Sequence, residues 1–279
     1  MKRVGVICDL DFTKHVQFKS YYYSLLALYG NVKVVSNINH LYGINILFIG
    51  GQDHGPHIDV YSTPLFIERC NELKITIVLI SVEKIFGSTY KEHLERYNLI
   101  SKCNKFVHYT YDIEDTKKLN TKLFRVCLSK HYEGWITIAD EKKDAMVFCG
   151  VMYLWRKQLI EELRKHIWID IPERTDFRTW EDYLRLIGSY RYVLSPLGDG
   201  NAFVAKFYEI LLVNSIPVHQ VKYDTLLYYD KEAKFKDCIF FESANELIDK
   251  ILNFTLKSSY NTMWMEDELG KLLKEDNLL

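Results

Sequence analysis

The residues best placed to do chemistry lie in one stretch, Tyr192 to His219. An apolar run that predicts a strand enters a loop with two glycines, Gly198 and Gly200, and an apolar-periodic helix follows at once. Such a loop lets backbone N–H groups and the positive end of a helix approach phosphate oxygens. Lys206 lies in the first helical turn, where its ammonium can meet a diphosphate. Glu209, three residues further on, shares that helix face and can bind ribose hydroxyls.

The order of residues in this stretch is also that of a known enzyme family. The pattern Y-V-L-S-P-x-G-x-G, then K-F-Y-E-I-L-L, then N-S-I-P-V resembles the donor-site motif of exostosin-like glycosyltransferases, family 47. The resemblance implies an inverting enzyme with two Rossmann-like domains, the GT-B fold, that binds a UDP-sugar and requires no metal. It implies that the donor is held by Ser195, Pro196, Gly198, Gly200, Asn201, Lys206 and Glu209. The family usually has arginine where this chain has Lys206, so a point charge replaces a planar fork.

A narrower resemblance comes from the small size and the abundance of Tyr, Lys and Asn. In these respects the chain resembles the short glycosyltransferases of the chloroviruses. That resemblance implies UDP-xylose as the donor and a fucose-containing N-glycan of a viral glycoprotein as the acceptor. Either resemblance implies an oligosaccharide or glycoprotein acceptor.

Two arginines are further candidates for holding the diphosphate. Arg156 follows a predicted strand that ends in Cys149 and Gly150, and Arg174 lies in the loop after the next predicted strand. Ligands of parallel sheets bind at the carboxyl ends of the strands. We therefore expect Gly150, Arg156 and Arg174 to line the donor site, although a glycine after a strand and a surface arginine are both common.

Inverting transfer needs a base that takes the proton of the acceptor hydroxyl. Asp53, with His54 beside it, is the first choice, and Asp11 and Glu83 are further candidates that follow strands of the first domain. Gly51-Gln52-Asp53-His54 resembles a Gly-x-Asp-His stretch of family 47 but comes earlier in this chain. A glycine-rich turn with capping residues is the alternative interpretation.

Three alternatives to this enzyme remain open. The chain can be a GT-B-like binding protein that has lost catalysis. Asp9 and Asp11 have the D-x-D spacing of metal-dependent sugar transferases, which hold the donor through a divalent cation. Finally, the glycines can merely make the tight turn of an ordinary βαβ unit, with Lys206 and Glu209 as a solvated pair.

The bulk composition excludes several classes of protein. Hydrophobic residues make up 48% and charged residues 26% of the chain, as in globular proteins with a sizeable core. The formal net charge of -1 provides no field for nucleic acid, so we expect no nucleic-acid partner. No apolar run is long enough to span a bilayer, and the six cysteines are widely spaced. We therefore expect a soluble, cytoplasmic protein without a transmembrane segment.

Short apolar runs alternate with helical patterns along the whole chain, which predicts an α/β protein with parallel sheets. The alternation restarts after a polar stretch near residues 139–144. We expect an acceptor-side Rossmann-like domain over residues 1–135 and a nucleotide-sugar-binding domain over 136–279, facing a central cleft. Helices near the C-terminus should close the second domain, although the last helix could cross back onto the first.

Overall fold

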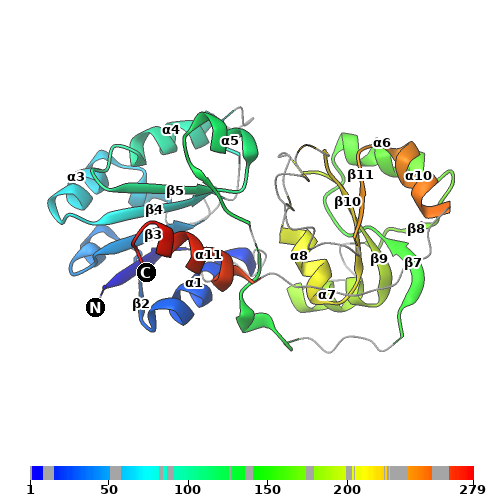
Figure 1. Ribbon diagram of the computed structural model, residues 1–279, viewed down its shortest axis with the longest axis horizontal. Coiled ribbons are helices and arrows are strands. Elements are labelled where there is room, and N and C mark those ends of the chain that lie inside the picture. Colours follow the sequence, from blue (N-terminus) through cyan, green and yellow to red (C-terminus); the bar gives the residue numbers. More distant parts are fainter. Residues whose placement is uncertain are drawn as a thin grey trace. The chain divides into compact units, whose positions relative to one another are not determined.

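The computed structural model describes residues 2–8, 16–50, 58–81, 84–86, 91–125, 127–135, 141–173, 179–198, 203, 205–222, 224, 226, 238–252 and 264–279. Within these ranges the chain is an α/β protein with two parallel β-sheets and accompanying helices (Figure 1), which confirms the predicted class. It divides into two compact units, Met1–His131 with Trp264–Leu279, and Tyr132–Met263. None of the described helices is long and apolar enough to cross a membrane.

The first unit is built on a six-stranded sheet whose neighbouring strands are all parallel. In sheet order the strands are β2 (Val32–Val34), β1 (Val4–Ile7), β3 (Ile46–Gly50), β4 (Thr76–Ser81), β5 (Phe106–Thr110) and β6 (Lys122–Leu123). The helices described in this unit are α1 (Val16–Tyr29), α2 (Ile58–Tyr61), α3 (Pro64–Glu72), α4 (Lys91–Ile100), α5 (Ile113–Lys118) and α11 (Met265–Glu275). A 3-10 turn, η1 (Ile38–Leu41), also belongs to this unit, and a second, η2 (Lys130–Tyr132), spans the boundary between the two units.

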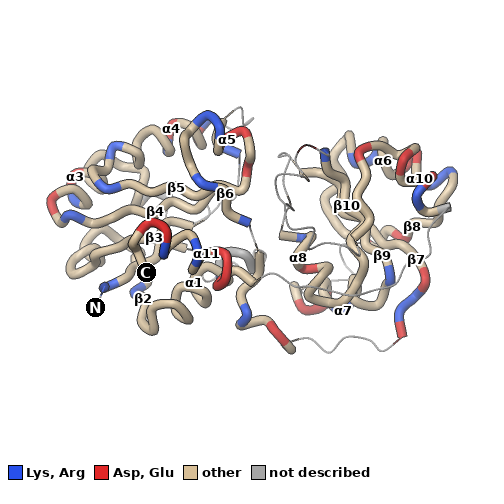
Figure 2. Tube along the Cα trace, in the orientation of Figure 1, with Lys and Arg blue, Asp and Glu red and all other residues tan. Residues whose placement is uncertain are grey.

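Alternate residues of these strands pack on opposite faces of the sheet. In β3, Leu47 and Ile49 belong to the buried cluster that includes Phe66 of α3. The ring of Phe48 lies on the other face, 6.1 Å from the ring of Tyr29 in α1, measured between centroids. Because both faces are covered, the central strands are continuous apolar runs. Figure 2 accordingly shows no charged residue in β3 or β4.

The second unit has a five-stranded parallel sheet in the order β11 (Ile239–Phe241), β10 (Ile216–Gln220), β9 (Tyr190–Ser195), β7 (Lys143–Val147) and β8 (Ile169–Asp170). Its described helices are α6 (Leu154–Leu163), α7 (Trp180–Gly188), α8 (Ala205–Leu212) and α10 (Ala244–Leu252). Met146 and Phe148 pack toward α6 and α10, whereas Val147 and Cys149 pack toward α7 and α8. The two helix pairs therefore lie on opposite faces of the sheet, as Figure 1 shows.

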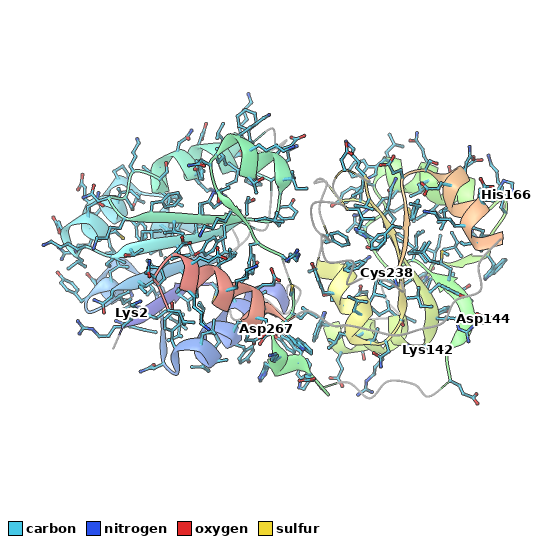
Figure 3. The ribbon with its side chains drawn as sticks, viewed as in Figure 1. Lys2, Lys142, Asp144, His166, Cys238 and Asp267 are labelled. Atoms are coloured by element: carbon cyan, nitrogen blue, oxygen red, sulfur yellow. The ribbon has the colours of Figure 1, made fainter. Side chains whose placement is uncertain are left out.

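A half-buried lysine joins α7 to α8. Lys142, labelled in Figure 3, precedes β7, and its ammonium donates to the carbonyls of Gly188 (2.7 Å) and Val213 (2.8 Å) and to Ser215 Oγ (3.0 Å). These carbonyls lie at the C-terminal ends of the two helices, where a cation is favourable. Burial lowers the pKa of Lys142 to about 8, so the ammonium is retained at neutral pH. These hydrogen bonds of Lys142 hold α7 and α8 together, and both helices contribute to the site described below.

The last helix requires a correction of the predicted domains. The sequence assigns residues 136–279 to the second domain, but α11 belongs to the first unit, where it packs on α1. The Tyr109 hydroxyl donates to the Asp276 carboxylate at 2.6 Å, and Arg125 donates to Glu268 at 2.9 Å. Charged groups at both ends of α11 thus bind the first unit, so the crossing that the sequence left open does occur.

The assignment of α11 to the first unit predicts which unit a cavity in α11 destabilises. Leu269 of α11 and Leu184 of α7 are both fully buried. Leu269→Ala should destabilise the first unit by about 2 to 5 kcal/mol, because it leaves a cavity against that unit's core. Amide hydrogen exchange should then accelerate in β1 to β5 and not in β7, β9 or β10. Leu184→Ala is the matched control and should give the reverse pattern; faster exchange of the second sheet in Leu269→Ala would contradict the assignment.

Candidate functional site

The described site residues lie at the point in the second sheet where successive strands are added on opposite sides of β7. The chain passes from β7 to β8 on one side, and the next strand, β9, pairs with β7 on the other side. In parallel α/β sheets, ligands bind outside the carboxyl ends of the strands at such a switch point. Residues that follow β7 and β9 therefore flank the position at which this fold class binds ligands.

Lys206, in the first turn of α8, reaches back to the end of β7. Its ammonium donates to the Cys149 carbonyl, and Nζ lies 5.2 Å from the centroid of the Phe148 ring. A methyl group on Gly150 would come within 2.7 Å of Nζ, so the glycine leaves the space that the ammonium occupies. The lysine side chain is half-buried there. Two residues far apart in the chain thus define one position for the positive charge.

Arg156 connects the loops that follow β7 and β9. Its Nε donates to the Leu197 carbonyl at 3.1 Å and its Nη1 donates to the Val151 carbonyl at 3.0 Å, while Cζ lies 5.0 Å from the centroid of the Tyr153 ring. The N–H of Leu197 donates to Gln220 Oε1 at 3.3 Å, so both backbone polar groups of this residue are bonded. The guanidinium therefore bridges the two sides of the switch point.

Two cations share this corner of the unit. Burial, and then the nearby charge of Arg156, lower the pKa of Lys206 to about 8, and burial also lowers the pKa of Arg156. Within the described part of the chain, neither cation forms an ion pair with a carboxylate. The first turn of a helix also disfavours a cation, because the helix dipole is positive there. A polyvalent anion would offset the lost solvation, the repulsion between the two cations and the unfavourable helix dipole together.

Glu209 shares a face of α8 with Lys206 but has a different partner. Its Oε1 accepts a hydrogen bond from Trp180 Nε1 at 2.9 Å. The carboxylate is half-buried, and burial raises its pKa. Among the residues that the structure describes, no ion pair joins Lys206 to Glu209. The two side chains are therefore not the solvated pair that an ordinary βαβ unit predicts.

The carboxyl end of β9 is held by its contacts with His219 of β10. Ser195 and Pro196 are buried, and Ser195 Oγ lies 3.1 Å from Nδ1 of His219, its neighbour in β10. The imidazole stacks on Phe203 at 5.0 Å, and burial lowers the pKa of His219 to about 3, so the ring is neutral at physiological pH. These contacts set the direction of the loop that contains Gly198, which is half-buried. Contact of Ser195, Pro196 and Gly198 with a donor stays a prediction.

The remaining predicted site residues lie outside the described residues: Asp11, Asp53, His54, Arg174, Gly200 and Asn201, with the further candidates Asp9 and Glu83. The strands that precede Asp11 and Asp53 are described. They are β1 and β3, which pair directly, with β2 on the other side of β1. Because β2 and β3 pair on opposite sides of β1, the switch point of the first sheet lies between β1 and β3. Asp11 and Asp53 follow these two strands.

Sequence reasoning missed Trp180 and the Leu197 carbonyl. A local signal did exist for Trp180, because Thr179 and Asp182 form a capping box that starts α7 at this residue. The partner of the indole, Glu209, comes 29 residues later, and only the packing of α7 on α8 brings them together. The Leu197 carbonyl is a backbone group and has no residue signature.

No protein-family model matches the sequence, and no curated protein matches it. The interpretation of the site therefore depends on its geometry and on the motif from Tyr192 to His219.

The contact between Gly150 and Lys206 gives a direct prediction. In Gly150→Ala the added methyl group would lie 2.7 Å from Nζ, and the flexible end of the lysine should move away. Because the charge leaves its place beside Arg156, affinity for pyrophosphate should fall about tenfold, which calorimetry measures. The melting temperature, measured alongside, reports any strain on the buried Phe148 ring, which lies 3.2 Å from the added methyl group. Unchanged pyrophosphate affinity would show that this position of the ammonium is irrelevant to anion binding.

Proposed function

We propose that the protein is an inverting glycosyltransferase of the GT-B type that uses a UDP-sugar as donor. The observation that carries the proposal is the pair of half-buried cations, Lys206 and Arg156, at the carboxyl ends of β7 and β9. Their position matches the switch point at which doubly wound sheets bind nucleotides.

The chemistry of this corner suits a diphosphate. A diphosphate carries more than one negative charge, so it can neutralise the lysine ammonium and the guanidinium at the same time. Lysine supplies a compact charge and arginine a planar fork of donors, and both bind phosphate oxygens. The first turn of α8 adds the positive end of a helix. A bound diphosphate would offset both the repulsion between the two cations and the unfavourable dipole of α8.

The neighbouring carboxylate extends the match from a diphosphate to a nucleotide. Glu209 shares the helix face of Lys206, so ribose hydroxyls can donate to it while the diphosphate contacts the lysine. The motif from Tyr192 to His219 resembles that of family 47, which favours UDP as the nucleotide and inversion as the stereochemical outcome. The resemblance to the chlorovirus enzymes favours xylose as the transferred sugar and a fucose-containing glycan as the acceptor.

The acceptor hydroxyl needs a base, and we assign that role to Asp53 with His54 beside it, with Asp11 and Glu83 as further candidates. In the reaction, the acceptor oxygen forms a bond to the anomeric carbon as the bond to the diphosphate breaks. The base takes the hydroxyl proton, and UDP leaves with the bonding electron pair. The cations of the second unit would stabilise the charge that develops on the leaving diphosphate.

The donor assignment predicts opposite effects of one substitution on stability and on binding. Burial lowers the pKa of Lys206 from 10.5 to about 8, so at pH 7 the folded protein holds a charge that the unfolded chain solvates better. Lys206→Met should therefore raise the free energy of unfolding without ligand by about 1 to 3 kcal/mol. The gain should be complete below pH 8 and shrink between pH 8 and 10.5, where the wild-type lysine loses its proton.

The same variant should bind UDP at least about tenfold more weakly in calorimetry. Lys157→Met is the matched control, because Lys157 lies on α6 with an exposed side chain, and it should change neither quantity. A Lys206→Met protein that is less stable than the wild type, or that binds UDP equally well, would contradict the assignment.

Turnover decides between the proposed enzyme and its alternatives. Release of UDP from a panel of UDP-sugars, with fucose-containing and other glycan acceptors, should require Lys206 and continue in excess chelator. Asp53→Asn should bind UDP normally but release none from the sugar donor. Nucleotide binding without turnover across the panel would favour a GT-B-like binding protein. Loss of turnover in chelator would favour the metal-dependent alternative built on Asp9 and Asp11.

A further inference from the structure

We propose that Trp180 is a positioning residue that holds the Glu209 carboxylate in place for a vicinal diol, the ribose of the bound nucleotide. The inference rests on the proposed function and deepens it, because it makes the second unit selective for a nucleotide over a bare diphosphate. Trp180 lies outside the motif from Tyr192 to His219.

The hydrogen bond to Glu209 comes from a side chain whose backbone position is fixed. Trp180 is the first residue of α7, directly after the N-cap Thr179. The N–H of Asp182 donates to Thr179 Oγ1 at 3.0 Å, and the N–H of Thr179 donates to the Asp182 carboxylate at 3.1 Å. This reciprocal cap determines where α7 begins. The indole therefore starts from one backbone position, from which its N–H reaches Glu209 Oε1 at 2.9 Å.

Two further aromatic rings hold the plane of the indole. The centroid of the Tyr132 ring lies 5.0 Å from that of Trp180, edge to face, and the Trp135 centroid lies 5.7 Å from it. Tyr132 is itself buried, and its ring lies 5.4 Å from that of Trp135. These spacings are those of favourable aromatic pairs. The cluster fixes the direction in which the indole N–H points. A solvent-exposed tryptophan would not need its N–H held in one direction.

This hydrogen bond prepares the carboxylate for hydroxyl donors. Burial raises the pKa of Glu209, whereas the hydrogen bond from Trp180, the charge of Lys206 and a hydrogen bond from Tyr183 lower it. An ionised carboxylate only accepts hydrogen bonds, while a protonated one also donates. The indole binds Oε1, and Tyr183 is a second hydrogen-bond donor to the carboxylate, whose remaining lone pairs can accept from ribose hydroxyls. The tryptophan thus favours the ionised form of Glu209 and orients its carboxylate.

The test uses ligands that separate the ribose from the diphosphate. Calorimetry compares UDP, its 2′,3′-dideoxy analogue and inorganic pyrophosphate on the wild type and on Trp180→Phe, which keeps a ring but lacks the N–H. The wild type should bind UDP about tenfold or more tightly than the dideoxy analogue, since two hydroxyl contacts are lost. In Trp180→Phe this ratio should fall toward one, while pyrophosphate affinity stays that of the wild type.

A pH series adds a measurement that a merely structural role would not change. Without the indole N–H, the pKa of Glu209 should rise further, so UDP affinity should decline on acidification at a higher pH in Trp180→Phe than in the wild type. Trp168→Phe is the matched control, because this tryptophan is exposed and donates to Asp170 at 2.7 Å. It should leave the UDP ratio and the pH series unchanged.

Glu209→Gln keeps the result interpretable if Trp180→Phe is poorly folded. This variant should also lose the preference for UDP over the dideoxy analogue, and Trp180→Phe should add no further loss to it. A preference retained in Trp180→Phe, or an equal loss of pyrophosphate affinity in it, would overturn the positioning role. If the wild type bound neither UDP nor pyrophosphate, the proposed function itself would fall, and the inference with it.

Discussion

The site depends on one unusual placement of charge, a lysine ammonium held half-buried beside a guanidinium at the start of a helix. Lys206 loses solvation, lies close to Arg156 and opposes the dipole of α8, and the described chain offers it only a carbonyl partner. A protein that evolves only for stability does not accumulate three such penalties at one residue. Unfavourable placements of this kind are most often found at functional sites. An anion bound beside Lys206 and Arg156 would explain all three penalties.

The surrounding structure can be understood as support for that placement. Gly150 has no side chain where the ammonium lies, and Leu197 is held through its carbonyl by Arg156 and through its N–H by Gln220. Lys142 braces the C-terminal ends of α7 and α8, while the hydrogen bond between Trp180 and Glu209 joins the other parts of the same two helices. Residues from distant segments of the second unit thus support the position of Lys206.

Periodicity was enough to predict the class of fold and most of its elements. β9 spans Tyr190–Ser195 as expected, because a helix ending on glycine precedes it and a glycine loop follows. The apolar run from Leu123 to Cys127 suggests a longer strand than β6, which is Lys122–Leu123. The N–H of Phe124 still donates to Thr110 of β5, and beyond it Arg125 and Lys130 bond to α11. The motif predicted Lys206 and Glu209 on one face, but their separate partners, Cys149 and Trp180, arise from packing between distant segments. The base assignments stay predictions, since Asp53 and Asp11 lie outside the described residues.

A crystal structure of the protein with UDP would test the central claim most directly. Diphosphate oxygens should lie within about 3 Å of Lys206 Nζ and of the Arg156 guanidinium. The ribose hydroxyls should donate to the Glu209 carboxylate that Trp180 orients. A complex in which UDP binds away from the carboxyl ends of β7 and β9, with Lys206 still bound only to the Cys149 carbonyl, would contradict it.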